Sequence, residues 1–277
     1  MTVMSKKENE YHDTMKSIIW DIFQERALSQ RIITDVIKFH QSSVFFRVKN
    51  MRSSFISPDV RVWLENVECT DVLPDIFEEE IPLSIEKVRI NGSNRSYNLS
   101  YRMDEKTLGA IMYKAFGRDN ETLSKRYGSA GALYPVMPLL LVLKPNVISS
   151  LPMPGVYMFN PLSNSIYRIR KWTEKDLEKL KECIFIDGEE FVSSLVMAYA
   201  IDIRRAVTKY GKRGYRHALI EVGLMAQGFR ESLREVKENL GDLCWSGFND
   251  NALTYLVGLN VRLAPVVLLQ WFGERGD

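Results

Sequence analysis

The sequence predicts an α+β fold in which helices come first and a mixed run of strands and helices follows. Apolar residues recur with helical 3-4 spacing near the N-terminus and again over 219–240. Short runs of branched apolar residues at 138–143 and 194–203 predict buried strands. Strands and helices do not alternate regularly, so their order favours an α+β domain over a doubly wound parallel sheet.

The first part of the chain predicts mainly helices. Residues 8–49 indicate one or two helices with a break near Ser29, and residues 50–100 are less regular because prolines interrupt them. The segment 104–116 predicts a further helix. Its buried face would consist of Leu108, Ile111, Met112 and Ala115.

The middle of the chain predicts three strands and a helix. The buried strand at 138–143 precedes two segments, 156–159 and 165–169, that predict a β-hairpin. Thr173 is followed three residues later by an acidic residue, which predicts the capped start of a helix ending near Cys183.

The last third begins with the strand 194–203 and continues with the strongest helical pattern of the chain. The apolar residues of 219–240 keep a 3-4 spacing, and Gly241 is expected as the C-cap. A short helix ending near Val257 and an apolar strand at 264–272 complete the predicted fold.

Composition and charge exclude several classes of protein. The chain has 277 residues and a net charge of +2, so its overall charge gives no argument for nucleic-acid binding. Its three cysteines and three histidines lack metal-ligand spacing, so we expect no metal site and no disulfide framework. The N-terminus lacks the apolar core of a signal peptide, and no uncharged apolar run reaches the roughly 18 residues of a membrane helix. We therefore expect a cytoplasmic protein that binds neither nucleic acid nor membrane.

A basic and aromatic run lies between the strand 194–203 and the long helix. Residues 209–216 are KYGKRGYR, which places four cations and two phenols beside two glycines. The adjacent Lys209 and Tyr210 suit proton transfer, provided that burial or neighbouring charges bring their pKa values toward neutrality. A solvated basic loop is the alternative.

A loop of small residues precedes the strand at 138–143. Its sequence from Arg126 to Pro135 is RYGSAGALYP. The small side chains of 128–132 let a backbone approach a flat or phosphorylated ligand, and the Ser129 hydroxyl adds a donor. The spacing matches neither the dinucleotide-binding nor the P-loop fingerprint, and a plain turn also fits.

Other polar groups suit ligand binding less specifically. Arg95 with Ser96 is a candidate phosphate grip, and Ser246-Gly247, expected between two helices, is a candidate anion site. On the long helix, Glu221 and Gln227 fall on polar or border positions, and Glu221 is a weak candidate for a general base. The alternatives are a polar loop, a plain turn and a solvated or locally paired carboxylate.

Taken in order, these motifs resemble the nitroreductase-like flavoproteins, and among them the SagB/ThcOx-type (microcin-type) azoline dehydrogenases. The resemblance covers about residues 90–273, and it departs from the family at Gly128, where proline is usual, and at Met137, where glutamate is frequent. The motifs that carry it are SAGALYP at 129–135, Lys209-Tyr210, Arg213-Gly214-Tyr215-Arg216, Glu221-x-Gly223 with Gln227, Gly247-Phe248 with Asp250, and Ala264-Pro265.

The resemblance implies a central, mostly antiparallel sheet flanked by helices, with an N-terminal helical extension. Residues 86–277 would form the FMN-binding domain, and 1–85 an extension that docks a partner or the peptide. FMN at the interface of a homodimer is implied, with cyclodehydratase subunits and a precursor peptide as partners. The cofactor-binding residues would be Arg95, Ser96, Arg126, Ser129, Ala130, Gly131, Ala132, Tyr215, Arg216, Gln227, Ser246 and Gly247.

The implied reaction is the oxidation of thiazoline or oxazoline rings to thiazoles or oxazoles in a ribosomally made peptide. One ring hydrogen leaves as a proton and the other as hydride to flavin N5. Lys209 and Tyr210 match the catalytic pair of the family. A free phenol has a pKa of about 10, so one that acts as a base near neutrality needs a cation beside it. This makes Tyr210 the base or proton relay and Lys209 its activator, but the roles could be exchanged, or both residues could mainly orient the ring.

The predicted position of the pair sets a geometric condition. Adjacent residues of a strand point to opposite faces, so Lys209 and Tyr210 reach one ring only if the backbone turns there, which Gly211 permits. Two other functions stay open. A nitroreductase-type enzyme acting on small molecules would use NAD(P)H, and a scaffold subunit would bind flavin or peptide without catalysis.

Overall fold

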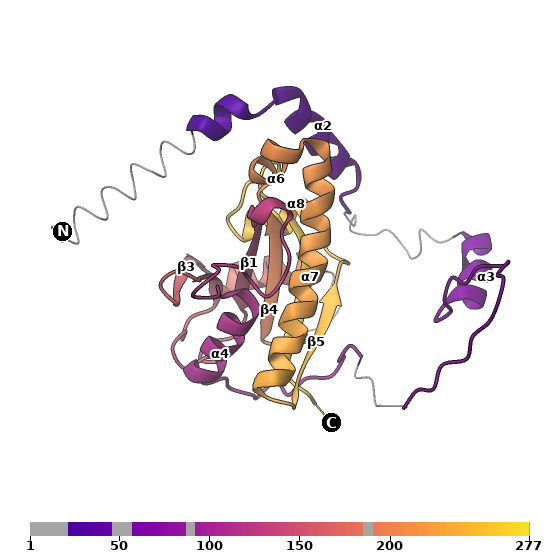
Figure 1. Ribbon diagram of the computed structural model, residues 1–277. Helices are drawn as coiled ribbons and strands as arrows, with labels where there is room; N and C mark the ends of the chain where they lie inside the picture. The colour runs from indigo at the N-terminus through magenta and orange to yellow at the C-terminus, as the bar shows by residue number, and fades with distance from the viewer. Residues whose placement is uncertain (1–21, 46–56, 87–91, 185–190, 277) are drawn as a thin grey trace. The chain divides into compact units, whose positions relative to one another are not determined.

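The computed structural model describes residues 22–45, 57–86, 92–184 and 191–276 (Figure 1). The chain divides into two compact units, one formed by Met1–Phe46 with Ser93–Asp277 and the other by Arg47–Gly92. The predicted division into a docking extension, 1–85, and an FMN-binding domain, 86–277, stays a prediction. The first helical segment predicted near the N-terminus lies largely outside the described residues.

A six-stranded sheet forms the centre of the larger unit, with the strand order β3-β2-β1-β4-β6-β5. Every neighbouring pair is antiparallel, which confirms the predicted α+β class and the antiparallel sheet. The strands are β1 (Val136–Val142), β2 (Gly155–Asn160), β3 (Ser165–Lys171), β4 (Leu195–Ile201), β5 (Leu240–Trp245) and β6 (Val266–Glu274).

Helices cover both faces of this sheet, and α7 runs along one of them (Figure 1). Residues of β1 and β4 alternate between the two faces, as strand geometry requires. One face packs on α2, α4, α6 and α7, and the other on α5 and α8. The helices of this unit are α2 (Gln30–Ser42), α4 (Glu105–Phe116), α5 (Glu174–Cys183), α6 (Ile203–Tyr210), α7 (Lys212–Val236) and α8 (Asp250–Leu256), with a 3-10 turn η1 (Ala130–Ala132).

Local capping signals place several helix starts where the sequence predicts them. Ser29 caps α2 and Asp104 caps α4, each by accepting a hydrogen bond from a backbone N–H of the first turn. Thr173 and Asp176 form the predicted capping box of α5. These side chains satisfy amide groups that a helix start leaves without an internal partner.

The segment after α7 differs from the prediction. The helix ends at Val236, and residues 240–245 form β5 instead of a turn between helices. Gly241 is therefore not a C-cap; it lies in β5, where a Cβ would come 2.8 Å from the Cβ of Asn94. Pairing with β6 determines that this segment forms a strand. Leu240 fits the helical spacing only by coincidence.

A second difference concerns the basic and aromatic run. The strand β4 ends at Ile201, and Asp202 caps a short helix, α6, by accepting a hydrogen bond from the Arg205 N–H. Lys209 and Tyr210 form the last turn of α6. Gly211, with φ 57°, then separates α6 from α7.

The smaller unit contains one described helix, α3 (Pro58–Val67), which the sequence did not predict. Ser57 caps it and Pro58 occupies its first turn, where a missing N–H costs nothing. Across the described parts of both units, no helix combines the length and apolar character needed to cross a bilayer.

Candidate functional site

The small-residue loop meets the end of α6. Gly131 has φ 64°, and a Cβ built on it would lie 2.7 Å from the Tyr210 phenol oxygen and 3.0 Å from Lys209 Nζ. Both polar atoms therefore converge on the same point of the loop backbone. The structure thus brings together two of the motifs that the sequence singled out.

Several residues of the loop have positive φ, and hydrogen bonds hold this backbone conformation in place. Ala132 and Tyr134 also have positive φ, at 53° and 47°. The Ser129 hydroxyl oxygen accepts a hydrogen bond of 2.8 Å from the Tyr134 N–H, and the Arg205 guanidinium donates to the Leu133 carbonyl. These contacts tie the loop to itself and to α6, so its shape does not depend on small side chains alone.

Lys209 and Tyr210 lie side by side on a helix. Lys209 Nζ is 5.1 Å from the centre of the Tyr210 ring, with the lysine exposed and the tyrosine half-buried. Consecutive residues of an α-helix are separated by about 100° around the axis, and not by the half-turn of a strand. Both side chains can therefore face one ligand without a turn at Gly211, and the expected geometric condition does not apply.

Buried polar groups lie behind this pair. Glu221 on α7 is only 2 % exposed, and its carboxyl group lies close to the Ser129 hydroxyl. Burial raises the pKa of Glu221 to about 7, although Ser129, Lys125 and Arg205 act in the opposite direction. The imidazole of His217 packs against Tyr210, with ring centres 5.2 Å apart. The expected polar or border position of Glu221 is wrong, because the loop covers this part of α7.

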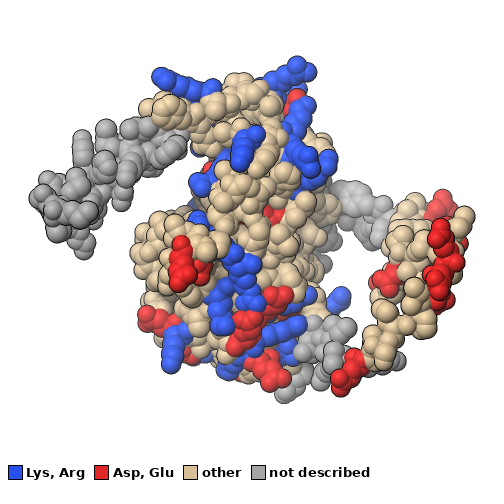
Figure 2. Space-filling view, viewed as in Figure 1, with Lys and Arg blue, Asp and Glu red and all other residues tan. Residues whose placement is uncertain are grey.

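Cations surround the site. Figure 2 shows Lys and Arg side chains gathered over the end of α7 that adjoins α6. Burial lowers the pKa of Lys125 to about 8, and its ammonium lies over the rings of Tyr127 and Tyr134 at 5.6 Å and 5.3 Å. The exposed cations at the helix junction are Lys209, Lys212, Arg213 and Arg216.

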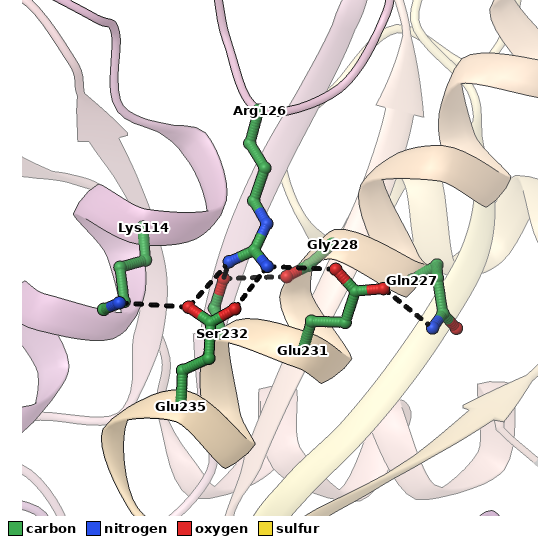
Figure 3. Close-up of polar contacts among 7 residues, drawn as sticks. All are labelled: Lys114, Arg126, Gln227, Gly228, Glu231, Ser232 and Glu235. Atoms are coloured by element: carbon green, nitrogen blue, oxygen red, sulfur yellow. Dashed lines mark hydrogen bonds and ion pairs between the residues drawn. The ribbon is translucent and has the colours of Figure 1, made fainter.

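Arg126 and Gln227 belong to a separate polar network (Figure 3). The Arg126 guanidinium forms ion pairs with Glu231 and Glu235 and donates a hydrogen bond of 3.2 Å to Ser232. Gln227 donates a hydrogen bond of 3.2 Å to Glu231. These contacts join the loop start to the C-terminal half of α7.

Arg95 and Ser96 lie near the far end of α7. They are exposed, and the preceding Asn94 N–H donates a hydrogen bond of 2.8 Å to the carbonyl of Asp242, whose carboxylate pairs with Arg230 at 2.7 Å. Residues 217 and 230 are about 20 Å apart along the helix axis at 1.5 Å per residue. One copy of the chain therefore does not bring Arg95 and Ser96 to Tyr210.

The other predicted binding residues lie at separate places in the fold. Tyr215 is buried, and its phenol oxygen lies 2.7 Å from Nδ1 of His40 on α2. Arg216 lines a groove of about 420 Å³ between α2 and α7. Ser246 and Gly247 follow the end of β5, where the Gly247 carbonyl accepts a hydrogen bond of 2.8 Å from the Trp245 indole.

Comparison with known proteins decides the family. No protein-family profile matches the chain. A protein of Methanocaldococcus jannaschii named as a nitroreductase, MJ1384, is 31% identical over 200 residues, which cover 71% of this chain and 92% of that protein. The chain belongs to the nitroreductase family.

Other nitroreductase-like proteins support the fold. The microcin B17-processing protein McbC of Escherichia coli is 26% identical over 178 residues, and the match spans 64% of each chain, slightly under two thirds of McbC. A chain of the Escherichia coli microcin synthetase complex McbBCD, bound to truncated pro-MccB17, superposes with a TM-score of 0.76 at 22% identity, covering 92% of this chain and 97% of that one. A nitroreductase-type protein of Ralstonia eutropha superposes with a TM-score of 0.52 at 16% identity, covering 71% and 89%. The predicted nitroreductase-like fold is confirmed.

Nitroreductases are flavin-dependent oxidoreductases, and the site fits a flavin. A flat ring system can approach a backbone whose side chains are small, and Ala130, Gly131 and Ala132 form such a stretch beside a polar pair. Gly131 cannot carry a Cβ without meeting Tyr210 and Lys209, so this surface is shaped by the pair itself.

Proposed function

We propose that this nitroreductase-family chain is an FMN-dependent azoline dehydrogenase. It would oxidise thiazoline or oxazoline rings to thiazoles or oxazoles in a ribosomally made peptide. The contact of Gly131 with Lys209 and Tyr210 carries the proposal, since it joins a proton-transfer pair to a loop suited to a flat ring. Similarity to McbC, named for its part in processing microcin B17, supports the peptide substrate. Similarity to a chain of the McbBCD complex supports cyclodehydratase-type partner subunits.

The flavin would be held first by the loop 129–132. When bound, FMN supplies the two-electron acceptor of the reaction. Arg95 and Ser96 lie too far from Tyr210 to share a site within one copy, so the proposal includes a homodimer in which a second copy supplies such groups. The remaining predicted cofactor contacts, which stay predictions, are Arg126, Tyr215, Arg216, Gln227, Ser246 and Gly247.

The chain's own residues would handle the proton. Tyr210 would take the proton from the ring Cα at its phenol oxygen, as base or proton relay, and the Lys209 ammonium lies beside its ring. The protein would take one hydrogen of the ring as a proton, and FMN, when bound, would supply the acceptor for the other as hydride, so two hydrogens would leave the ring in total. Lys209 is exposed, which leaves this side of the site open to a peptide.

A small-molecule nitroreductase is the second candidate, and the 31% identity to the Methanocaldococcus jannaschii protein favours it. The two functions differ in their need for a nicotinamide. An azoline dehydrogenase oxidises a cyclised peptide with FMN and oxygen alone, whereas a nitroreductase depends on NAD(P)H. Peptide oxidation without added nicotinamide supports the proposal; flavin reduction by NAD(P)H with no peptide oxidation contradicts it. A purified protein that binds no flavin would indicate an FMN-free scaffold subunit.

The proposal extends to residues 1–85 and to the cellular location. We propose that this extension docks a partner subunit or the peptide, and that the protein acts in the cytoplasm. A truncated chain that still assembles with its partner subunits and its peptide would contradict the docking role.

A further inference from the structure

A small cavity lies behind Tyr210, between the loop, α6 and α7. Its free volume is about 10 Å³, which corresponds to about one water molecule. The polar residues that line it are Ser129, Tyr210, His217 and Glu221. Of these four residues, the proposed reaction uses only Tyr210, through the phenol oxygen that lies beside Gly131.

Two polar atoms of this lining are buried without a hydrogen-bond partner. They are Oε1 of Glu221 and Nδ1 of His217. The two residues are four positions apart on α7, so their side chains lie on one face, and both line the cavity. Leaving such atoms unsatisfied costs stability, and buried groups of this kind in native proteins call for a specific explanation.

We propose that Glu221, which lines the cavity beside His217, holds the proton that the substrate ring releases and that Tyr210 relays. This inference rests on the proposed function. Tyr210 accepts the ring proton at its phenol oxygen as its own hydroxyl proton moves to the Glu221 carboxylate, so the phenol is unchanged and Glu221 becomes a neutral carboxyl group. FMN, when bound, would supply the acceptor for the hydride, and Glu221 returns the proton to solvent before the next turnover. Glu221 is only 2 % exposed, so it would act through Tyr210 as a positioning residue and would not touch the substrate.

The surroundings of Glu221 suit a group that exchanges a proton near neutrality. The titratable groups that face it are Lys125 and Tyr127 from the loop, Arg205 and Tyr210 from α6, and His217 from its own helix. Burial outweighs the two cations and raises the pKa of Glu221 to about 7. An ordinary glutamate carboxyl group, with a pKa of about 4.3, would be almost entirely deprotonated at pH 7.

Glu221→Gln tests the inference, because it keeps the shape of the side chain and removes its titration. Glu178→Gln is the matched control, since it makes the same change on an exposed carboxylate of α5. The first readout is the pH profile of ring oxidation by the FMN-loaded protein. We expect a wild-type rate that rises with pH around about pH 7, and a Glu221→Gln rate that is at least about tenfold lower and lacks this limb. Glu221→Asp should retain part of the limb, and Glu178→Gln should behave as wild type.

The second readout needs no substrate. Infrared spectra of the protein should contain a protonated-carboxyl band at about pH 5.5 that disappears by about pH 8.5 and is missing from Glu221→Gln. Glu178→Gln should keep the band. A wild-type protein that oxidises no ring contradicts the proposed function. A protein that oxidises rings with the same pH profile in wild type and Glu221→Gln, or that lacks the band, contradicts this inference alone.

Discussion

The phenol oxygen of Tyr210 occupies the space into which a side chain at position 131 would grow. A Cβ on Gly131 would come 2.7 Å from that oxygen, and 3.0 Å from Lys209 Nζ, closer than heavy atoms normally approach. The two segments are far apart in sequence, so a glycine in the loop and a phenol on α6 define one site. The proposed function depends on this arrangement.

Gly131→Ala should therefore damage the site and not the fold. The added methyl group must displace Tyr210 or Lys209, and the positive φ adds about 1–2 kcal/mol of strain. We expect ring oxidation to fall at least about tenfold while the protein stays folded. Gly128→Ala is the matched control, because a Cβ there meets nothing within 4 Å. Equal rates for both variants would contradict the assignment of the site.

Tyr210→Phe and Lys209→Ala should separate chemistry from cofactor binding. Each removes one proposed proton-transfer group, and the loop that would hold FMN remains. We expect both variants to retain FMN and to lose about 10²–10⁴-fold in ring oxidation. Flavin absorbance and single-turnover rates measure the two effects separately. Full activity in both variants would refute their catalytic role.

Local signals explain which parts of the fold can be predicted from the sequence. Ser29, Asp104 and Thr173 mark helix starts because each side chain bonds to its own first turn. The strand β5 and the helix α6 are missed, because pairing with β6 and the cap at Asp202 outweigh the apolar pattern around them.

The site shows the same division. The small-residue loop and the pair at 209–210 can be picked out from their residue types, and in the structure the two segments lie next to each other. The burial of Glu221 was missed, since it depends on which face of α7 the loop covers. One signal was present: Glu221 and His217 share a helix face with the small residues Gly214 and Ala218, which allow a close approach.

Tyr215→Phe should reduce stability by removing a contact between α2 and α7. The hydrogen bond of 2.7 Å to His40 is buried, and its loss leaves Nδ1 of His40 without a partner. We expect the free energy of unfolding to fall by about 1–3 kcal/mol in chemical denaturation. Tyr255→Phe serves as the control because Tyr255 is 73% exposed. Unchanged stability together with weaker FMN binding would instead favour the predicted cofactor role of Tyr215.

Arg126→Gln should loosen the loop from α7. Its guanidinium joins Glu231 and Glu235, and hydrogen bonds from Arg126 and Lys114 hold the pKa of Glu235 down to about 2. The groups are partly exposed, so we expect a loss of about 1 kcal/mol that shrinks at high salt. Lys114→Gln removes one contact to Glu235 and should cost less. A large salt-independent loss of FMN affinity in Arg126→Gln would point to direct cofactor binding.

Glu221 should make the stability of the protein depend on pH. Its pKa is raised on folding from 4.5 to about 7, so the folded state retains the proton that the unfolded state releases. The resulting stabilisation is complete below about pH 4.5 and is lost as pH rises through about 7. Relative to Glu221→Gln, the wild type should therefore lose about 3 kcal/mol over this range, as measured by denaturation at several pH values. Parallel pH curves for the two proteins would rule out a buried titrating carboxyl.

The mass of a cyclised precursor peptide after incubation with this protein, FMN and oxygen tests the central proposal most directly. The account predicts a loss of about 2 Da per azoline ring without added nicotinamide, the mass of the two hydrogens removed in one two-electron step. Tyr210→Phe, loaded with FMN to the same extent, should leave the mass almost unchanged. A wild-type protein that binds FMN, joins its partner subunits and still leaves every ring unoxidised would contradict the account.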